Sequence, residues 1–181
     1  LQSAGFMQPM DQKKNPEIGR FSFADGGEAS LYVDMLIEEE GFSPVAKKLF
    51  DEKAVTIGHG HYGTDYKEGD TITEEQAKKL LLQDIEIRLP EIKKAIPNFN
   101  NFSENLKKRI MSGWYRGSIK PDHSTVELLN KGLFSEAAKE FLNHQEYLTE
   151  RKLGKKSKKY GIVPRMEKTS RAMAEEQVAR K

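Results

Sequence analysis

The sequence predicts an α+β protein with a small lobe that contains a β-hairpin and a larger helical lobe. Apolar residues recur at helical spacing along most of the chain. One stretch, from about residue 49 to residue 72, instead alternates in hydropathy and is rich in glycine, which is typical of a small antiparallel sheet. The chain has 181 residues, enough for one domain of two lobes with a sizeable core.

The first helix is expected from Glu28 to Glu40. Its expected buried stripe consists of Leu31, Tyr32, Met35 and Leu36. Glu40 follows Leu36 by four residues and falls on the same face, and Gly41 suits the positive φ at which helices end. A carboxyl group on a buried face, at the negative end of a helix dipole, is harder to ionise, as a general acid requires. The alternative is that residues 38–40 form a solvated acidic helix end.

The hairpin follows a short connection that carries two acids, Asp51 and Glu52. Val55 and Ile57 alternate with polar or small residues, and three glycines at positions 58, 60 and 63 mark turns. Glu40, an acid of the connection and Thr56 would then lie close together. Two carboxylates and a water-positioning hydroxyl are the minimum equipment for hydrolysing a glycosidic bond, because one acid protonates the leaving oxygen and the other stabilises positive charge or activates water.

Other chemistries have weaker support. His59 and His61, with Asp65 nearby, would share one face of a strand and suggest two metal ligands, but structural histidines are the favoured interpretation because no third ligand has a recognised spacing. The chain has no cysteine and no G-x-S-x-G motif. No metal and no cofactor are therefore expected.

The rest of the chain is predicted to be helical. Thr73-x-x-Gln76 is a capping box that opens a long helix, which Pro90 and Pro97 are expected to break or redirect. Its buried stripe is expected to be Ala77, Leu80, Leu81, Ile85 and Leu89. Further helices are expected to start at Ser103, at a capping box Ser124-x-x-Glu127, and at Ser135. Trp114 is interpreted as a core residue, with a sugar-binding platform as the alternative.

These motifs resemble the phage-type lysozymes, the endolysin muramidases of glycoside hydrolase family 24. The resemblance is carried by Glu39-Glu40-Gly41, by Thr56-Ile57-Gly58-His59-Gly60-His61, and by a glycine turn followed by Ile72-Thr73 before a helix. It continues through residues 124–132 and 161–165. It implies a lysozyme-like fold and hydrolysis of the β-1,4 bond between N-acetylmuramic acid and N-acetylglucosamine in peptidoglycan.

The resemblance also implies roles for single residues. Glu40 matches the general acid, Asp51 the second carboxylate and Thr56 the hydroxyl that positions water. His61 matches a histidine held in a supporting polar network. Because the spacing around Asp51 differs from the family's, Glu52 and Asp65 remain alternatives for the second carboxylate.

Charge is divided unevenly along the chain. The formal net charge is −7 up to Glu104 and +9 from Asn105 onward, and the run from Arg151 to Lys159 holds six basic residues and no acid. A cationic segment favours an anionic envelope polymer, and a solvated loop is the alternative. A nucleic-acid partner is not expected, because no recognised module accompanies the run. No apolar run is long enough to span a membrane.

Residues 1–27 are expected to be a flexible arm or linker, and residues 28–181 the lysozyme-like domain. Since the chain does not begin with Met, we expect a processed product or a fragment, for example a unit of a larger virion protein. The isolated domain is expected to be a monomer. It would be phage-encoded and act on the host wall, reached from the host cytoplasm or carried in the virion. The alternatives are an inactive wall-binding or virion structural module, a lytic transglycosylase, or a chitinase.

Overall fold

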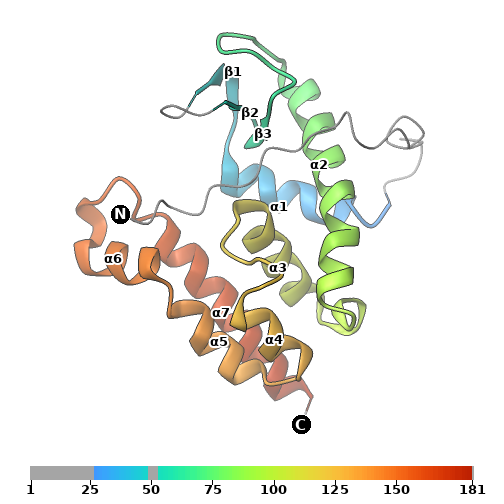
Figure 1. Ribbon diagram of the computed structural model, residues 1–181, viewed down its shortest axis with the longest axis vertical. Coiled ribbons are helices and arrows are strands. Elements are labelled where there is room, and N and C mark those ends of the chain that lie inside the picture. The colour runs from blue at the N-terminus through green and yellow to red at the C-terminus, as the bar shows by residue number, and fades with distance from the viewer. Residues whose placement is uncertain (1–26, 49–52, 181) are drawn as a thin grey trace. The chain divides into compact units, whose positions relative to one another are not determined.

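The computed structural model describes residues 27–48 and 53–180 (Figure 1). The elements in chain order are α1 (Ser30–Glu40), β1 (Ser43–Lys47), β2 (Val55–Gly58), β3 (His61–Gly63), α2 (Glu74–Ala95), η3 (Phe99–Asn101), α3 (Glu104–Arg116), α4 (Ser124–Asn130), α5 (Phe134–Leu142), α6 (Gln145–Leu153), η4 (Gly154–Lys156) and α7 (Ile162–Ala179). The predicted arm, apart from Gly27, lies outside the described residues, as do Asp51 and Glu52. Within the described part, no helix is long and apolar enough to cross a membrane.

The described chain divides into two compact units, residues 27–89 and residues 90–180. The first unit contains α1, the sheet and most of α2, and the second contains the remaining helices. This division agrees with the predicted small lobe with a hairpin and larger helical lobe. The boundary falls within α2, at Leu89 and Pro90.

In the first unit, α1 buries Tyr32, Val33 and Leu36, whereas Leu31 is 49% exposed. The predicted stripe was therefore wrong at Leu31, since the buried face of the helix is rotated toward Val33. Glu40 lies four residues after Leu36 and is half-buried.

The sheet is antiparallel with strand order β1-β2-β3. Thr56 of β2 pairs with Lys47 of β1 on one side and with Tyr62 of β3 on the other. The sheet thus includes one strand more than the predicted hairpin, since β1 lies in the segment directly after α1. Its apolar face joins the start of α2 in a small core. That core consists of Ala46, Val55, Ile57, Ile72, Ala77 and Leu80.

The start of α2 agrees with the predicted capping box. The Thr73 N–H donates to Oε1 of Gln76 at 2.8 Å, and the Gln76 N–H donates to Oγ1 of Thr73 at 3.2 Å. All five residues of the predicted stripe are buried. Pro90 and Pro97 were expected to break or redirect the helix. Pro90 does not break it, because α2 continues to Ala95 with Pro90 inside it, and the helix ends two residues before Pro97. Proline removes one backbone donor, and in this helix the neighbouring turns continue without it.

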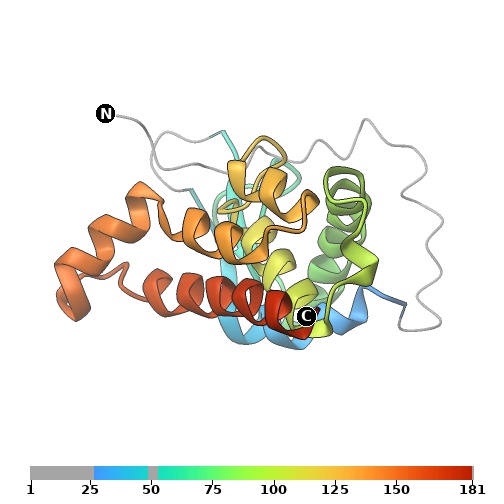
Figure 2. The same ribbon diagram turned by 90° about the horizontal axis from the view of Figure 1, so that it is seen from below.

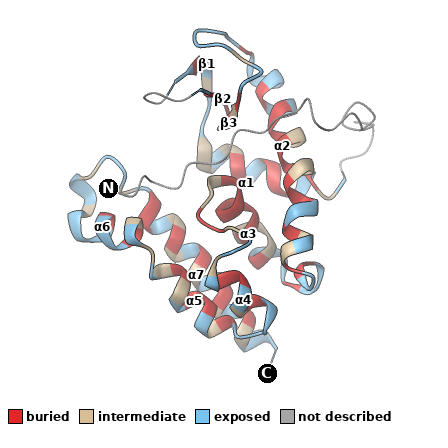
Figure 3. Cartoon of the chain, in the orientation of Figure 1, coloured by how far each residue is buried: buried red, intermediate tan, exposed pale blue. Residues whose placement is uncertain are grey.

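In the helical unit, α7 packs along α5 and also contacts α3 and α6 (Figures 1 and 2). In α3, Leu106 and every residue from 110 to 115 are buried, so the second half of this helix is covered on all sides (Figure 3). The Ser103 hydroxyl accepts from the Leu106 N–H, which confirms the predicted cap of α3. The capping box predicted at Ser124 was wrong: α4 follows His123 and has no side-chain cap. The helix predicted at Ser135 is α5, which begins one residue earlier.

Candidate active site

Glu40 is the last residue of α1. Directly after it, Gly41 has a φ of 69°, and its N–H donates to the Ile37 carbonyl at 3.0 Å. This positive φ agrees with the prediction that Gly41 ends the helix, because glycine reaches such angles without strain. The chain therefore leaves the helix sharply at the residue that follows the candidate acid.

Thr56 lies near the middle of the sheet and is half-buried. The backbone brings its strand close to the end of α1: Ser43, at the start of β1, pairs with Gly58 at the end of β2. Glu40 and Thr56 thus belong to the same compact unit, on segments that adjoin through β1. Asp51 and Glu52 lie outside the described residues, so their positions are not part of this geometry.

His59 lies in the turn between β2 and β3, and its side chain is buried. Its Nδ1 is within hydrogen-bond distance of the Gly41 carbonyl oxygen. A carbonyl oxygen only accepts, so Nδ1 carries the hydrogen. The imidazole ring also contacts the ring of Phe42, with 5.6 Å between centroids. His59 therefore connects the turn of the hairpin to the end of α1.

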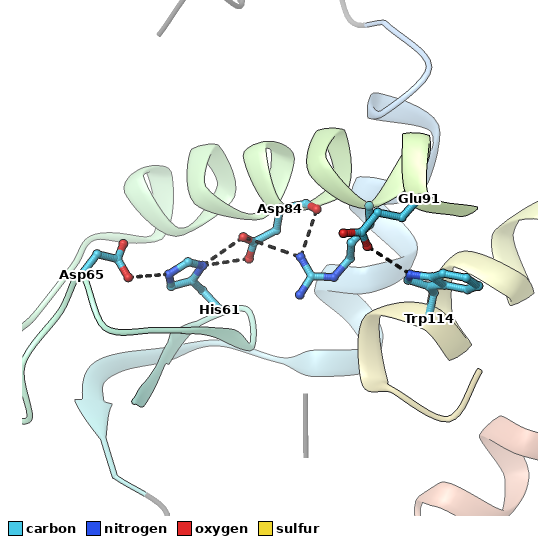
Figure 4. A network of polar contacts seen from close by, with 6 residues as sticks. His61, Asp65, Asp84, Glu91 and Trp114 are labelled. Atoms are coloured by element: carbon cyan, nitrogen blue, oxygen red, sulfur yellow. Dashed lines mark hydrogen bonds and ion pairs between the residues drawn. The ribbon is translucent and has the colours of Figure 1, made fainter. Parts of the chain in front are cut away.

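His61, on β3, is held between two carboxylates (Figure 4). Its Nδ1 lies 3.0 and 2.9 Å from the two carboxylate oxygens of Asp84 on α2, and its Nε2 lies 3.0 Å from Oδ1 of Asp65. Both ring nitrogens face oxygens that only accept while the carboxylates are ionised, an arrangement that favours the imidazolium form. Burial lowers the pKa of His61, but the hydrogen bonds and charges of Asp84 and Asp65 outweigh it and leave that pKa raised.

Asp84 is fully buried and has a second cationic neighbour, Arg88, one turn further along α2. Nη1 of Arg88 lies 3.7 Å from Oδ1 of Asp84 and donates to the Asp84 carbonyl oxygen at 3.0 Å. Two cations next to one buried carboxylate compensate for its desolvation. This polar group holds β3 against α2, as expected for the supporting network predicted at His61.

Asp65, one of the alternatives for the second carboxylate, is only partly exposed and forms the ion pair with Nε2 of His61. Its geometry is that of a partner of this histidine. Within the described ranges, no group of three or more His, Cys, Asp or Glu side chains is arranged to hold a metal ion. His59 and His61 instead bind different protein groups, a carbonyl and two carboxylates.

Trp114 belongs to the helical unit. It is 7% exposed, and its Nε1–H donates to Oε2 of Glu91 at 3.4 Å (Figure 4). The interpretation as a core residue is confirmed, since so little of the indole is exposed.

A comparison of sequences identifies the family. Residues 37–169, which include Glu40, Thr56 and His61, match the sequence profile of the phage lysozyme family. The chain belongs to the phage lysozyme family. This agrees with the resemblance of its motifs to phage-type lysozymes and with the predicted lysozyme-like α+β fold.

Similar proteins include endolysins from two Bacillus phages. The chain is 32% identical to the endolysin of phage B103 over 114 residues and 33% identical to that of phage PZA over 112 residues. These matches cover 61% and 60% of the chain but only 42% and 43% of the two relatives, so the chain spans less than half the length of either. A similar solved structure is the muramidase domain of SpmX from Asticaccaulis excentricus, with 25% identity and a TM-score of 0.49 over 68% of this chain and 80% of that one.

Asp84 and Arg88 were not predicted as members of this network from the sequence alone, and no contact was predicted for His59. The signal for Asp84 was present: it lies three residues after Leu81 and seven after Ala77, on the apolar stripe of α2. A charged residue on a buried helix face requires a partner. The bond from His59 to Gly41 had no comparable signal, because the acceptor is a backbone carbonyl 18 residues away.

Proposed function

We propose that this chain is a muramidase that hydrolyses the β-1,4 bond between N-acetylmuramic acid and N-acetylglucosamine in bacterial peptidoglycan. Membership of the phage lysozyme family carries the proposal, and similarity to two phage endolysins supports it. The position of Glu40 adds physical support, because it is half-buried at the carboxyl end of α1 and close in the fold to the sheet that carries Thr56.

In the proposed reaction, Glu40 protonates the leaving glycosidic oxygen. Asp51 is the general base or stabilises the positive charge of the oxocarbenium-like state, and Thr56 positions the attacking water. Glu52 is the alternative to Asp51. Asp65 is less suited to that role, since its carboxylate pairs with His61. No cofactor takes part in this scheme.

The biological setting belongs to the same proposal. The protein is phage-encoded and acts on the host wall, which it reaches from the host cytoplasm or as part of a virion. Its isolated domain, residues 28–181, is a monomer and follows an N-terminal arm of residues 1–27. The excess of basic residues after Glu104 favours approach to an anionic envelope polymer.

Digestion of purified peptidoglycan tests this proposal, with the released fragments identified by mass spectrometry. A muramidase releases fragments with reducing N-acetylmuramic acid ends. Anhydro-muramic ends would contradict hydrolysis and identify a lytic transglycosylase. Binding to peptidoglycan without any release of fragments would identify a wall-binding module and contradict the proposed activity.

A further inference from the structure

We infer that His59 is a positioning residue for Glu40, which it orients by donating a hydrogen bond from Nδ1 to the backbone carbonyl of Gly41. The inference rests on the proposed function of Glu40 as the acid. It assigns to His59 a role distinct from that of His61, although the two histidines are separated only by Gly60.

The first step concerns how Gly41 is held. Its N–H donates to Ile37 within α1, and its carbonyl accepts from His59 in the hairpin turn. Gly41 is itself exposed, and a Cβ added there would meet no described atom within 4 Å. Hydrogen bonds at its N–H and at its carbonyl, rather than side-chain packing, therefore hold Gly41, the residue that follows Glu40.

The second step concerns the donor, which lies in a well-held part of the hairpin. His59 is 1% exposed. Before it, Gly58 has a φ of 65°, and a Cβ there would lie 3.1 Å from Cβ of Ala77 and from Cδ1 of Ile72, so the strand lies very close to α2. After it, His61 is bound to Asp84 of the same helix. The position of the Nδ1 donor is thus fixed on both sides.

Together, these contacts fix the end of α1 relative to the turn between β2 and β3. The His59 hydrogen bond connects the hairpin that carries Thr56 to the end of α1, one residue beyond the acid. Catalytic groups must be held within about an ångström of the productive geometry, and a displacement of that size lowers rates by about 100-fold. Losing this bond would leave Glu40 on its helix but loosen the end of that helix relative to the sheet.

The ring of His59 also contacts Phe42, so His59 could instead act only by packing. These two roles predict different effects of substitution. Two substitutions separate the roles. His59→Asn keeps an N–H donor at the position of Nδ1 and removes the ring. His59→Phe keeps an aromatic ring of similar size and removes the donor. Positioning through the hydrogen bond requires that Asn preserves activity better than Phe, whereas ring packing requires the reverse order.

The experiment measures kcat and KM on soluble peptidoglycan oligomers for the full chain, the two His59 variants and Glu40→Gln. We expect His59→Phe to lower kcat about 10- to 100-fold, with KM changed less than about twofold, and His59→Asn to retain at least about a third of the parent kcat. Parent-like kcat in His59→Phe, or an equal loss in both variants, would overturn the inference. Parent-like activity in Glu40→Gln would instead remove the proposed function of Glu40.

A second readout does not depend on activity. The carboxyl carbon of Glu40 and the carbonyl carbon of Gly41 are followed by NMR at one fixed pH in each folded variant. We expect His59→Phe to shift both signals, and His59→Asn to leave both near the parent values. Unchanged signals in His59→Phe would overturn the inference even if the chain proved to have no hydrolytic activity.

Discussion

At the scale of single residues, the buried carboxylate of Asp84 organises the polar part of the first unit. It contacts His61 on β3 and Arg88 on its own helix, and His61 reaches Asp65 with its second nitrogen (Figure 4). The Cβ-less Gly63 makes room for this contact, since a Cβ there would lie 3.0 Å from Nε2 of His61 and closer still to Oδ1 of Asp65. Tyr66 packs edge-on against the imidazole, 6.0 Å between centroids. The hairpin is therefore held by charge as well as by its apolar core.

The raised pKa of His61 makes the stability of the protein depend on pH. Because the folded state binds the proton more tightly than the unfolded chain, the contribution of His61 is fully present below about pH 6.5, the ordinary value. It is lost as the pH rises through the raised folded pKa. We expect Asp65→Asn to lower the pKa of His61 and to move this loss of stability to lower pH.

NMR titration of the His61 imidazole, with urea unfolding from pH 5.5 to 9, measures both effects. Glu68→Gln serves as the control, because Glu68 is an exposed acid of the same loop. A His61 pKa in Asp65→Asn equal to that of the parent would contradict the ion pair.

At the scale of elements, β2 packs closely on α2, and this contact stabilises the first unit. Gly58 has a positive φ and almost touches Ala77, so two separate effects oppose a side chain there. We expect Gly58→Ala to destabilise the protein by more than the roughly 1–2 kcal/mol that a positive φ costs an ordinary residue. Gly132→Ala is the matched control, because Gly132 has a φ of 70° and no described atom within 4 Å of an added Cβ.

Urea unfolding of both variants measures the difference in unfolding free energy. Because the added Cβ would crowd Ala77 and Ile72, Gly58→Ala should have a lower unfolding free energy than Gly132→Ala. Equal losses would mean that the close approach to Ala77 relaxes without cost.

Elements with a periodic apolar pattern and a cap were predictable from the sequence. The capping box of Thr73 and Gln76 and the stripe from Ala77 to Leu89 are examples. β1 was not, because it is short, contains Pro44 and pairs with an irregular register. α7 begins at Ile162 and carries Pro164 in its first turn, where a missing N–H costs nothing.

In the candidate site, too, local sequence patterns predicted some features and not others. Glu40 and Thr56 are candidates because of local motifs, whereas the contacts of His59 and Asp84 join segments 18 and 23 residues apart. Local patterns do not encode such pairings.

At the scale of the whole molecule, the uneven charge is the main feature that bears on the proposed binding to the cell wall. Residues from Asn105 onward carry a net charge of +9. Within them, Lys155 and Lys156 of η4 are exposed, together with the neighbouring Lys152 and Lys158. An anionic polymer attracted to this run should be released by salt, since the screening length falls from about 8 Å at 0.15 M to about 3 Å at 1 M.

We expect the double substitution Lys155→Glu and Lys156→Glu to weaken binding to anionic cell walls and to reduce its dependence on salt. The control is Lys67→Glu with Lys78→Glu, which changes the net charge equally but within the first unit. Cosedimentation with cell walls over a range of NaCl concentrations measures the effect. Equal weakening by the control would show that net charge, rather than the basic run, determines binding.

The most direct test of the central claim is the rate at which purified peptidoglycan is cleared by the parent, by Glu40→Gln and by Glu38→Gln. Glu38 is an exposed acid on the same turn of α1, so its variant controls for the loss of one charge at the helix end. We predict that Glu40→Gln clears peptidoglycan about 10²- to 10⁴-fold more slowly, the usual contribution of a general acid, and that Glu38→Gln matches the parent. Equal clearing by the parent and Glu40→Gln would contradict the account.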